Sequence, residues 1–180
     1  MLIAKQKREE NIAEYILYIW QLEDILRAYN LDIQLIDANI VSQFKQTQPV
    51  ALQIRQWYKD MIDAMIAEGI QESGHLMHVK NIVQDLSALN ISLIRDPNQT
   101  DYHKVFEAAV PAIHDIIEKS SGNIKNEIDA CFNALYGMLI LRLKKVQISE
   151  ATVEAVKTIS TLIALLTKNY HDNECDIESC

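Results

Sequence analysis

Residues 11–29 read NIAEYILYIWQLEDILRAY, and the pattern of this stretch decides the fold of the chain. Its apolar residues recur at helical spacing and cover more of the helix than a surface helix needs. They are Ile12, Tyr15, Ile16, Ile19, Trp20, Leu22 and Leu26. Such a helix packs against neighbours on several sides, so we expect it at the centre of the protein. At about 100° per residue, Glu23 falls in the middle of the same apolar face.

The rest of the chain repeats the helical pattern, and no segment alternates like a strand. Apolar stripes predict helices over residues 4–29, 32–46, 49–68, 73–96, 100–119, 124–146 and 149–170. Glycines and prolines fall mostly between these segments, as they do between helices. The sequence therefore predicts an all-α protein, a single-domain antiparallel bundle of six or seven helices over residues 1–170. Residues 171–180, HDNECDIESC, lack periodicity and are predicted to form a mobile acidic tail.

The composition and charge of the chain indicate which partners it can have and where in the cell it is expected. A formal charge of −8 disfavours nucleic acid as a partner, because phosphates require clustered Lys and Arg. The longest apolar run, residues 15–20, is far shorter than the roughly 20 residues that cross a bilayer, so we expect no membrane partner. The amino terminus lacks the pattern of a secretory signal. Cys131, Cys175 and Cys180 do not make a disulfide framework. These features favour the cytoplasm.

One resemblance is visible in the first predicted helix. Residues 5–28, KQKREENIAEYILYIWQLEDILRA, resemble the opening of an uncharacterised bacterial (Bacteroidetes-type) family of short, all-helical proteins. The resemblance extends to the whole chain and implies a cytoplasmic helical protein of unknown function. It implies no activity, substrate or catalytic residue.

Charged residues on apolar faces are the first candidate site. Glu23 requires a cation, a metal or a proton if it is buried, because an unpaired carboxylate costs several kcal/mol in a core. Arg27, four residues further on, and Arg142, on the inward face of the segment 124–146, are candidate partners. Asp37 also lies within an apolar stripe. These residues form either a structural ion pair or a polar pocket between helices that binds a small ligand.

Histidines and carboxylates provide a second candidate site. His103, Glu107 and His114 share one edge of the predicted helix 100–119, where such side chains can bind a divalent metal if another helix supplies a further ligand. Glu72 and His75 have the Glu-x-x-His spacing of di-iron bundles. Only one such pair is present, and Gly74 within it makes a regular helix doubtful. The alternative is that all these residues are polar side chains on a helix flank.

The dipeptide His114-Asp115 offers a third candidate site. With the more distant His78 it is similar to the ligand set of helical metal-dependent phosphohydrolases, which also use a later Asp. Here that residue could only be Asp129 or Asp172. Large residues follow the pair, where that family has small ones, and Asp115 is predicted to point outward.

Other enzyme signatures, such as a phosphate-binding glycine loop or a nucleophile elbow, are absent from the sequence. We therefore expect a protein that binds other proteins or small ligands, without a cofactor and possessing a self-complementary surface for a homo-oligomer. A metal-dependent hydrolase that uses His, Asp and Glu ligands is the alternative.

Overall fold

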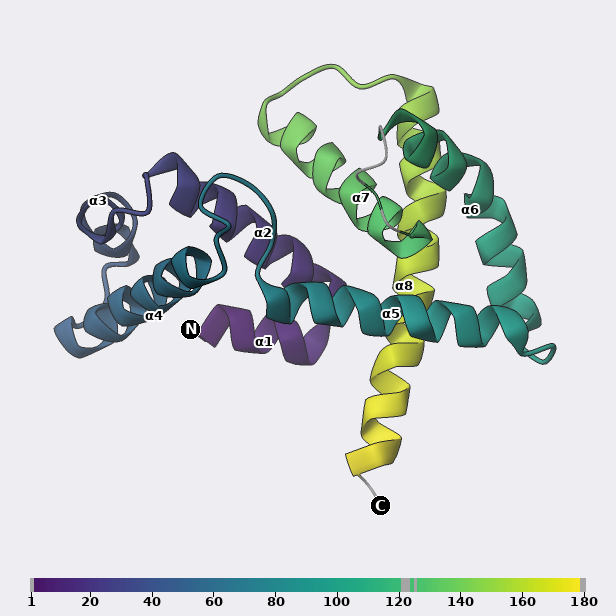
Figure 1. Ribbon diagram of the computed structural model, residues 1–180, viewed down its shortest axis with the longest axis horizontal. Helices are drawn as coiled ribbons and strands as arrows, with labels where there is room; N and C mark the ends of the chain where they lie inside the picture. The colour runs from purple at the N-terminus through teal and green to yellow at the C-terminus, as the bar shows by residue number, and fades with distance from the viewer. Residues whose placement is uncertain (1, 121–123, 125, 179–180) are drawn as a thin grey trace. The chain divides into compact units, whose positions relative to one another are not determined.

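The computed structural model is built of α-helices joined by short connections (Figure 1). It describes residues 2–120, 124 and 126–178, and the side chains of residues 3–120, 124 and 126–173. Within these ranges there are eight α-helices, one 3₁₀-helix and no strand. The helices are α1 (Leu2–Glu10), α2 (Ile12–Ala28), α3 (Ile33–Asn39), η1 (Val41–Phe44), α4 (Gln48–Ala67), α5 (Met77–Arg95), α6 (Thr100–Lys119), α7 (Glu127–Leu143) and α8 (Glu150–Glu178). The all-α prediction is confirmed, but six or seven helices is too few.

The extra helix arises at Asn11, where the first predicted helix divides into α1 and α2. Asn11 is extended, with φ −157° and ψ 105°, and its side chain accepts hydrogen bonds from the N–H groups of Ala13 and Glu14. An Asn in this position satisfies backbone donors that a new helix leaves unpaired. Residues 5–11, KQKREEN, contain no glycine or proline, so the prediction extended one helix through them.

Other boundaries also differ from the prediction. The segment 32–46 divides into α3, which Asp32 caps, and the short η1. Residues 73–76 precede α5 rather than forming its first turn. Helix α8 runs through Glu178, into the segment that was predicted to be a tail; residues 179–180 lie outside the described part.

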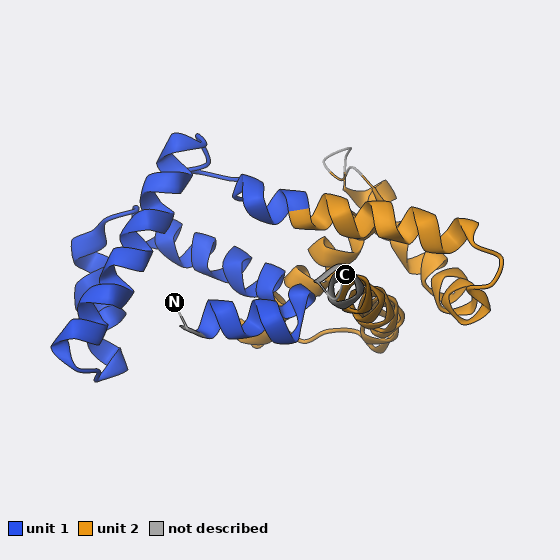
Figure 2. Ribbon diagram, turned by 90° about the horizontal axis from the view of Figure 1, so that it is seen from below, with its two compact units in different colours: residues 1–81 blue, residues 82–180 orange. Residues whose placement is uncertain are grey.

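The chain divides into two compact units, residues 1–81 (unit 1) and 82–180 (unit 2), which are blue and orange in Figure 2. The boundary lies within α5. The expectation of one domain over residues 1–170 stays a prediction, and each unit is described by itself.

Helix α2 contributes a large share of the buried residues of unit 1. Helix α2 packs against α1, and α3 packs against α4 and η1. Nine residues of α2 are buried: Ile12, Ala13, Tyr15, Ile16, Ile19, Trp20, Leu22, Glu23 and Leu26. Glu23 is the one charged side chain among them.

Unit 2 contains α6, α7 and α8 in mutual contact, together with most of α5. Its fully buried side chains include Ile113, Phe132, Ile159 and Leu162. Asn90 and Tyr102 are buried among them, each 2% exposed, and the Tyr102 hydroxyl donates to Asn90 Oδ1 over 2.6 Å. A neutral polar pair therefore joins α5 to α6 inside this unit.

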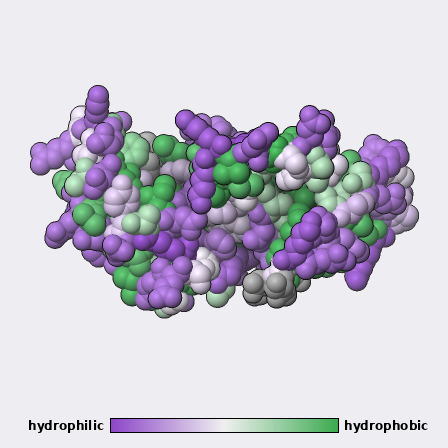
Figure 3. Space-filling view, turned by 90° about the horizontal axis from the view of Figure 1, so that it is seen from above, coloured by the Kyte–Doolittle hydropathy of each residue, from purple (hydrophilic) through white to green (hydrophobic). Residues whose placement is uncertain are grey.

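One face of the protein carries both polar and apolar side chains. On the face drawn in Figure 3, hydrophobic side chains (green) form separate areas between hydrophilic ones (purple). None of the helices in the described residues combines the length and the apolar character needed to span a membrane.

Candidate functional site

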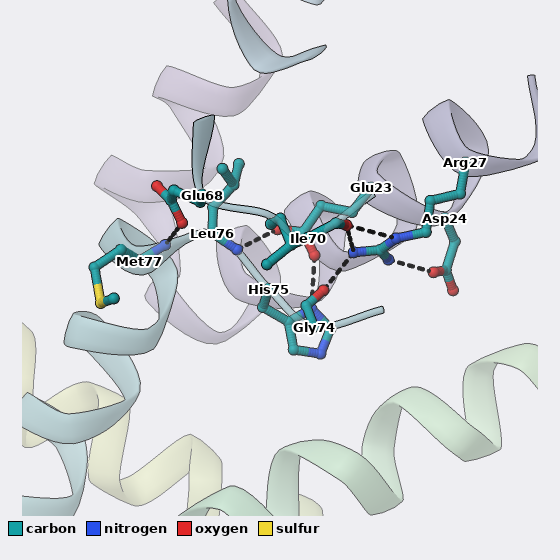
Figure 4. Close-up of polar contacts among 9 residues, drawn as sticks. All are labelled: Glu23, Asp24, Arg27, Glu68, Ile70, Gly74, His75, Leu76 and Met77. Atoms are coloured by element: carbon teal, nitrogen blue, oxygen red, sulfur yellow. Dashed lines mark hydrogen bonds and ion pairs between the residues drawn. The ribbon is translucent and has the colours of Figure 1, made fainter. Parts of the chain in front are cut away.

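The buried carboxylate of Glu23 lies at the centre of a polar cluster in unit 1 (Figure 4). Its side chain is 0% exposed. Oε2 lies 2.6 Å from Nδ1 of His75, and Oε1 accepts a hydrogen bond of 2.9 Å from the backbone N–H of Leu76. Since a carboxylate accepts hydrogen bonds, the proton of this contact is assigned to Nδ1. Glu23 therefore has two partners, both from the segment before α5.

The imidazole of His75 is fixed from two directions. Its ring stacks on the indole of Trp20 with a centroid distance of 3.9 Å and an interplanar angle of 9°. Glu23 holds one ring nitrogen, and Nε2 lies on the side of the ring away from that carboxylate (Figure 4). The side chain is 29% exposed. Stacking and hydrogen bonding together give this loop residue a single orientation.

Arg27 and Glu68 form hydrogen bonds with other backbone groups of the same segment. The guanidinium of Arg27 donates to the carbonyl oxygen of Ile70 over 3.2 Å and to that of Gly74, and it pairs with Asp24 over 2.9 Å. Glu68 accepts a hydrogen bond of 2.6 Å from the N–H of Met77, the first residue of α5.

Two carboxylates consequently accept hydrogen bonds from the backbone at the start of helix α5. The N–H of Leu76 donates to Glu23 and that of Met77 donates to Glu68. Negative charge is favourable at a helix amino terminus, where backbone N–H groups have no helical partner. The cluster of Glu23, Arg27, Glu68 and His75 thus stabilises a loop and the start of a helix, and its polar groups are used by the protein itself.

The other two residues of the predicted polar pocket lie elsewhere. Asp37, on α3, forms an ion pair of 3.4 Å with Nε of Arg55, and its side chain is 46% exposed. Arg142 is exposed in the last turn of α7, so its predicted inward position is wrong. A cation is favourable there because the carbonyl end of a helix is partially negative. The structure pairs Glu23 with His75, which the sequence did not suggest.

The candidate metal ligands of α6 do not form a metal-binding cluster within the described residues. Nε2 of His103 lies 3.2 Å from the carbonyl oxygen of Leu93, and Asp115 pairs with Lys119 over 2.6 Å. Glu107 and His114 are exposed. Throughout the described residues, no three His, Cys, Asp or Glu side chains come together in a way that could hold a metal ion.

His78, another candidate ligand, contacts Tyr15 instead. The Tyr15 hydroxyl lies 3.2 Å from Nε2 of His78. Removal of water by the surrounding protein lowers the pKa of His78, and Arg8 lowers it further, while Glu23 and Glu68 oppose the shift. Burial also raises the pKa of Tyr15. Both effects favour a neutral hydrogen-bonded pair.

Unit 1 also contains a cavity of about 630 Å³, which we call the Trp57 cavity. Its walls come from α1, from η1 with the connection that follows it, and from α4. The lining consists of Ile3, Lys5, Phe44, Gln46, Val50, Gln53, Ile54, Gln56, Trp57 and Asp60. Apolar side chains and amides dominate this set. A second cavity of about 410 Å³ borders Asp37, Lys45 and Arg55 among other residues.

Comparison with known families adds one finding. A family model described as a domain of unknown function matches residues 1–176. The chain belongs to the DUF4924 family. No curated protein and no solved structure matches it significantly. The expected membership of an uncharacterised family is confirmed, and the DUF4924 description assigns no activity to any residue of either cavity or of the Glu23 cluster.

The sequence did not single out the Trp57 cavity of this DUF4924 domain. Trp57 is an apolar residue of α4, and the structure leaves it half-buried. Gln53 and Gln56 are exposed residues of the same helix. The available signal was an aromatic residue next to several glutamines on one helix, and amides beside an aromatic ring are too common to predict a cavity.

Proposed function

We propose that unit 1 of this DUF4924 domain binds a small molecule in the Trp57 cavity. The observation that supports the proposal is the cavity itself. About 630 Å³ lies within the roughly 300–1,000 Å³ of most small-molecule sites, and its apolar lining with a few polar groups is typical of them. Residues Phe44, Val50, Ile54 and Trp57 provide the apolar surface that a ligand would bury.

The Glu23 cluster is a weaker candidate for the ligand site. Glu23, Arg27 and Glu68 each hydrogen-bond to the backbone of residues 70–77. A ligand that bound to them would have to replace these bonds, and the buried N–H of Leu76 would be left without its partner. The Trp57 cavity requires no such exchange.

Nuclear magnetic resonance with a library of uncharged fragments tests the proposal. We expect fragments to shift the backbone signals of Phe44 and Ile54 and the indole N–H signal of Trp57. Val50→Phe enlarges a lining residue and should weaken binding at least about tenfold, or 1.4 kcal/mol. Leu52→Phe is the matched control, since Leu52 lies on the same helix but is 59% exposed and outside the lining.

Two results would overturn the proposal. One is a library screen in which no fragment shifts the cavity signals. The other is an affinity that Val50→Phe leaves unchanged while the variant retains the fold of the wild type.

The proposal also covers the cellular location, origin and assembly of the protein. We infer a cytoplasmic protein of bacterial origin, folded as an antiparallel bundle and able to form a homo-oligomer, with no nucleic acid as partner. The charge of −8 supports the last point. Light scattering at high concentration tests the oligomer, and a strictly monomeric protein would exclude it.

A further inference from the structure

We infer that the ligand of the Trp57 cavity is an uncharged, planar heteroaromatic molecule with hydrogen-bond donors and acceptors on its edge. The inference rests on the proposed function and specifies its ligand. Three properties of the lining carry it: a fixed aromatic surface, side-chain amides that can pair with a ligand, and balanced charge.

The aromatic surface is the ring of Trp57. Its indole packs edge to face against Tyr58, with a centroid distance of 5.2 Å and an interplanar angle of 69°. Tyr58 is 2% exposed and fixed in the core, whereas Trp57 is half-buried and borders the cavity. Flat aromatic rings pack favourably against one another in stacked or edge-to-face arrangements. A planar ligand can use this surface more fully than a flexible chain.

The amides of three glutamines line the same cavity. Gln46 and Gln53 make no hydrogen bond with any other part of the described chain, while Gln56 donates to Asp60 Oδ1 over 2.7 Å. Each side-chain amide can both donate and accept hydrogen bonds. An alkyl chain would cover these groups without pairing them, and burial of an unpaired polar group opposes binding. The edge of a heteroaromatic ring can pair with them.

Charge in the lining is balanced. One cation, Lys5, and one anion, Asp60, border the cavity. Lys5 pairs with Glu9 over 3.7 Å, and Asp60 accepts the hydrogen bond from Gln56. The lining therefore offers no excess of positive charge to a carboxylate or phosphate and no excess of negative charge to an ammonium group. An uncharged ligand is the best match.

The test compares adenine, 1-octanol and octanoate by isothermal titration. Adenine is uncharged and planar with donors and acceptors on its edge, 1-octanol is uncharged and aliphatic, and octanoate is aliphatic and anionic. We expect adenine to bind at least about tenfold more tightly than either aliphatic compound, and Val50→Phe to weaken that binding.

Amide-deleting variants separate the polar from the apolar contribution. Gln53→Leu with Gln56→Leu should weaken adenine binding about tenfold and leave 1-octanol equal or tighter, because the amides become apolar. Gln84→Leu, an exposed site in unit 2, is the matched control and should change neither affinity. Circular dichroism verifies that each variant retains its helices.

The outcomes distinguish this inference from the proposed function. If 1-octanol or octanoate binds the cavity more tightly than adenine does, and Val50→Phe weakens it, the cavity binds ligands but the inferred class is wrong. If the double glutamine variant binds adenine as well as the wild type, the inferred role of the amides is wrong. If no compound or fragment binds, both proposals fail.

Discussion

The two units bury polar groups in different ways. In unit 1 the buried group is an acid, Glu23, and its partners are a histidine and a backbone N–H from an irregular segment. In unit 2 the buried pair is neutral, the hydroxyl of Tyr102 and the amide of Asn90, and both residues belong to regular helices. The acid therefore holds a loop in place, whereas the neutral pair fixes the contact between two helices.

The reason for the difference is the number of bonds that each group must make. The start of α5 leaves backbone N–H groups without helical partners, and a carboxylate can accept from several donors at once. The Tyr102 hydroxyl and the Asn90 amide instead bond directly to each other, through one side-chain hydrogen bond. Loss of the acid should consequently cost more than loss of the neutral pair.

The largest effect is expected for Glu23→Ala. It leaves the N–H of Leu76 and Nδ1 of His75 without their acceptor in a buried place, so the free energy of unfolding should fall by about 3–5 kcal/mol. Glu23→Gln retains one acceptor oxygen and should lose less. Urea denaturation followed by circular dichroism measures both values.

Asp37→Ala is the matched control for this prediction, since Asp37 is an acid of unit 1 in a half-exposed ion pair. It should lower the free energy of unfolding by less than about 1 kcal/mol. Equal losses for Glu23→Ala and Asp37→Ala would show that burial does not distinguish the two acids.

An intermediate effect is expected for the neutral pair. Tyr102→Phe removes the donor to Asn90 and should lower the free energy of unfolding by about 1–2 kcal/mol, and Asn90→Leu should act in the same range. The double variant should lose less than the sum of the single variants, because both polar partners are then absent. A thermodynamic cycle of urea denaturation measures the coupling; strict additivity would argue against an energetic role for the 2.6 Å contact.

The smallest effect concerns pH and the partly exposed His78. Its pKa is lowered in the folded state below the ordinary value of 6.5, so the unfolded chain binds more protons as pH falls below about 6.5. The contribution of His78 to stability is therefore complete above that pH and is lost as pH falls through the lowered pKa. His78→Gln should reduce the acid dependence of unfolding between pH 7.5 and roughly 5.

His114→Gln is the control for the pH experiment because His114, on α6 in unit 2, makes no hydrogen bond within the described residues, whereas His78 contacts Tyr15. Urea denaturation of the wild type and both variants at several pH values measures how the free energy of unfolding depends on pH. An acid dependence that His78→Gln leaves unchanged would contradict a neutral contact between His78 and Tyr15.

Much of the fold follows from local sequence, since five predicted segments correspond to the single helices α4, α5, α6, α7 and α8. The break at Asn11 was also visible in principle, because Asn followed three residues later by Glu14 is a helix-start pattern. The absence of glycine and proline from residues 1–29 concealed it. The division at residue 40 had no comparable signal.

The candidate site was predictable only in part. The helical period placed Glu23 in the core, but its partner, His75, lies 52 residues away in a loop. No local pattern specifies which loop residue reaches a given helix. The Trp57 cavity depends on a space that three elements leave between them, and periodicity describes the faces of single helices rather than the fit between their side chains.

The chain passes from unit 1 to unit 2 inside α5, between Asn81 and Ile82. Proteases cleave extended, exposed segments most readily, and a hydrogen-bonded helix offers none at that point. Fragments meant to separate the units are therefore poorly designed if they end at the boundary, because five residues of α5, 77–81, would remain without the turns that follow. Deletion and fusion experiments on DUF4924 domains should retain α5 whole.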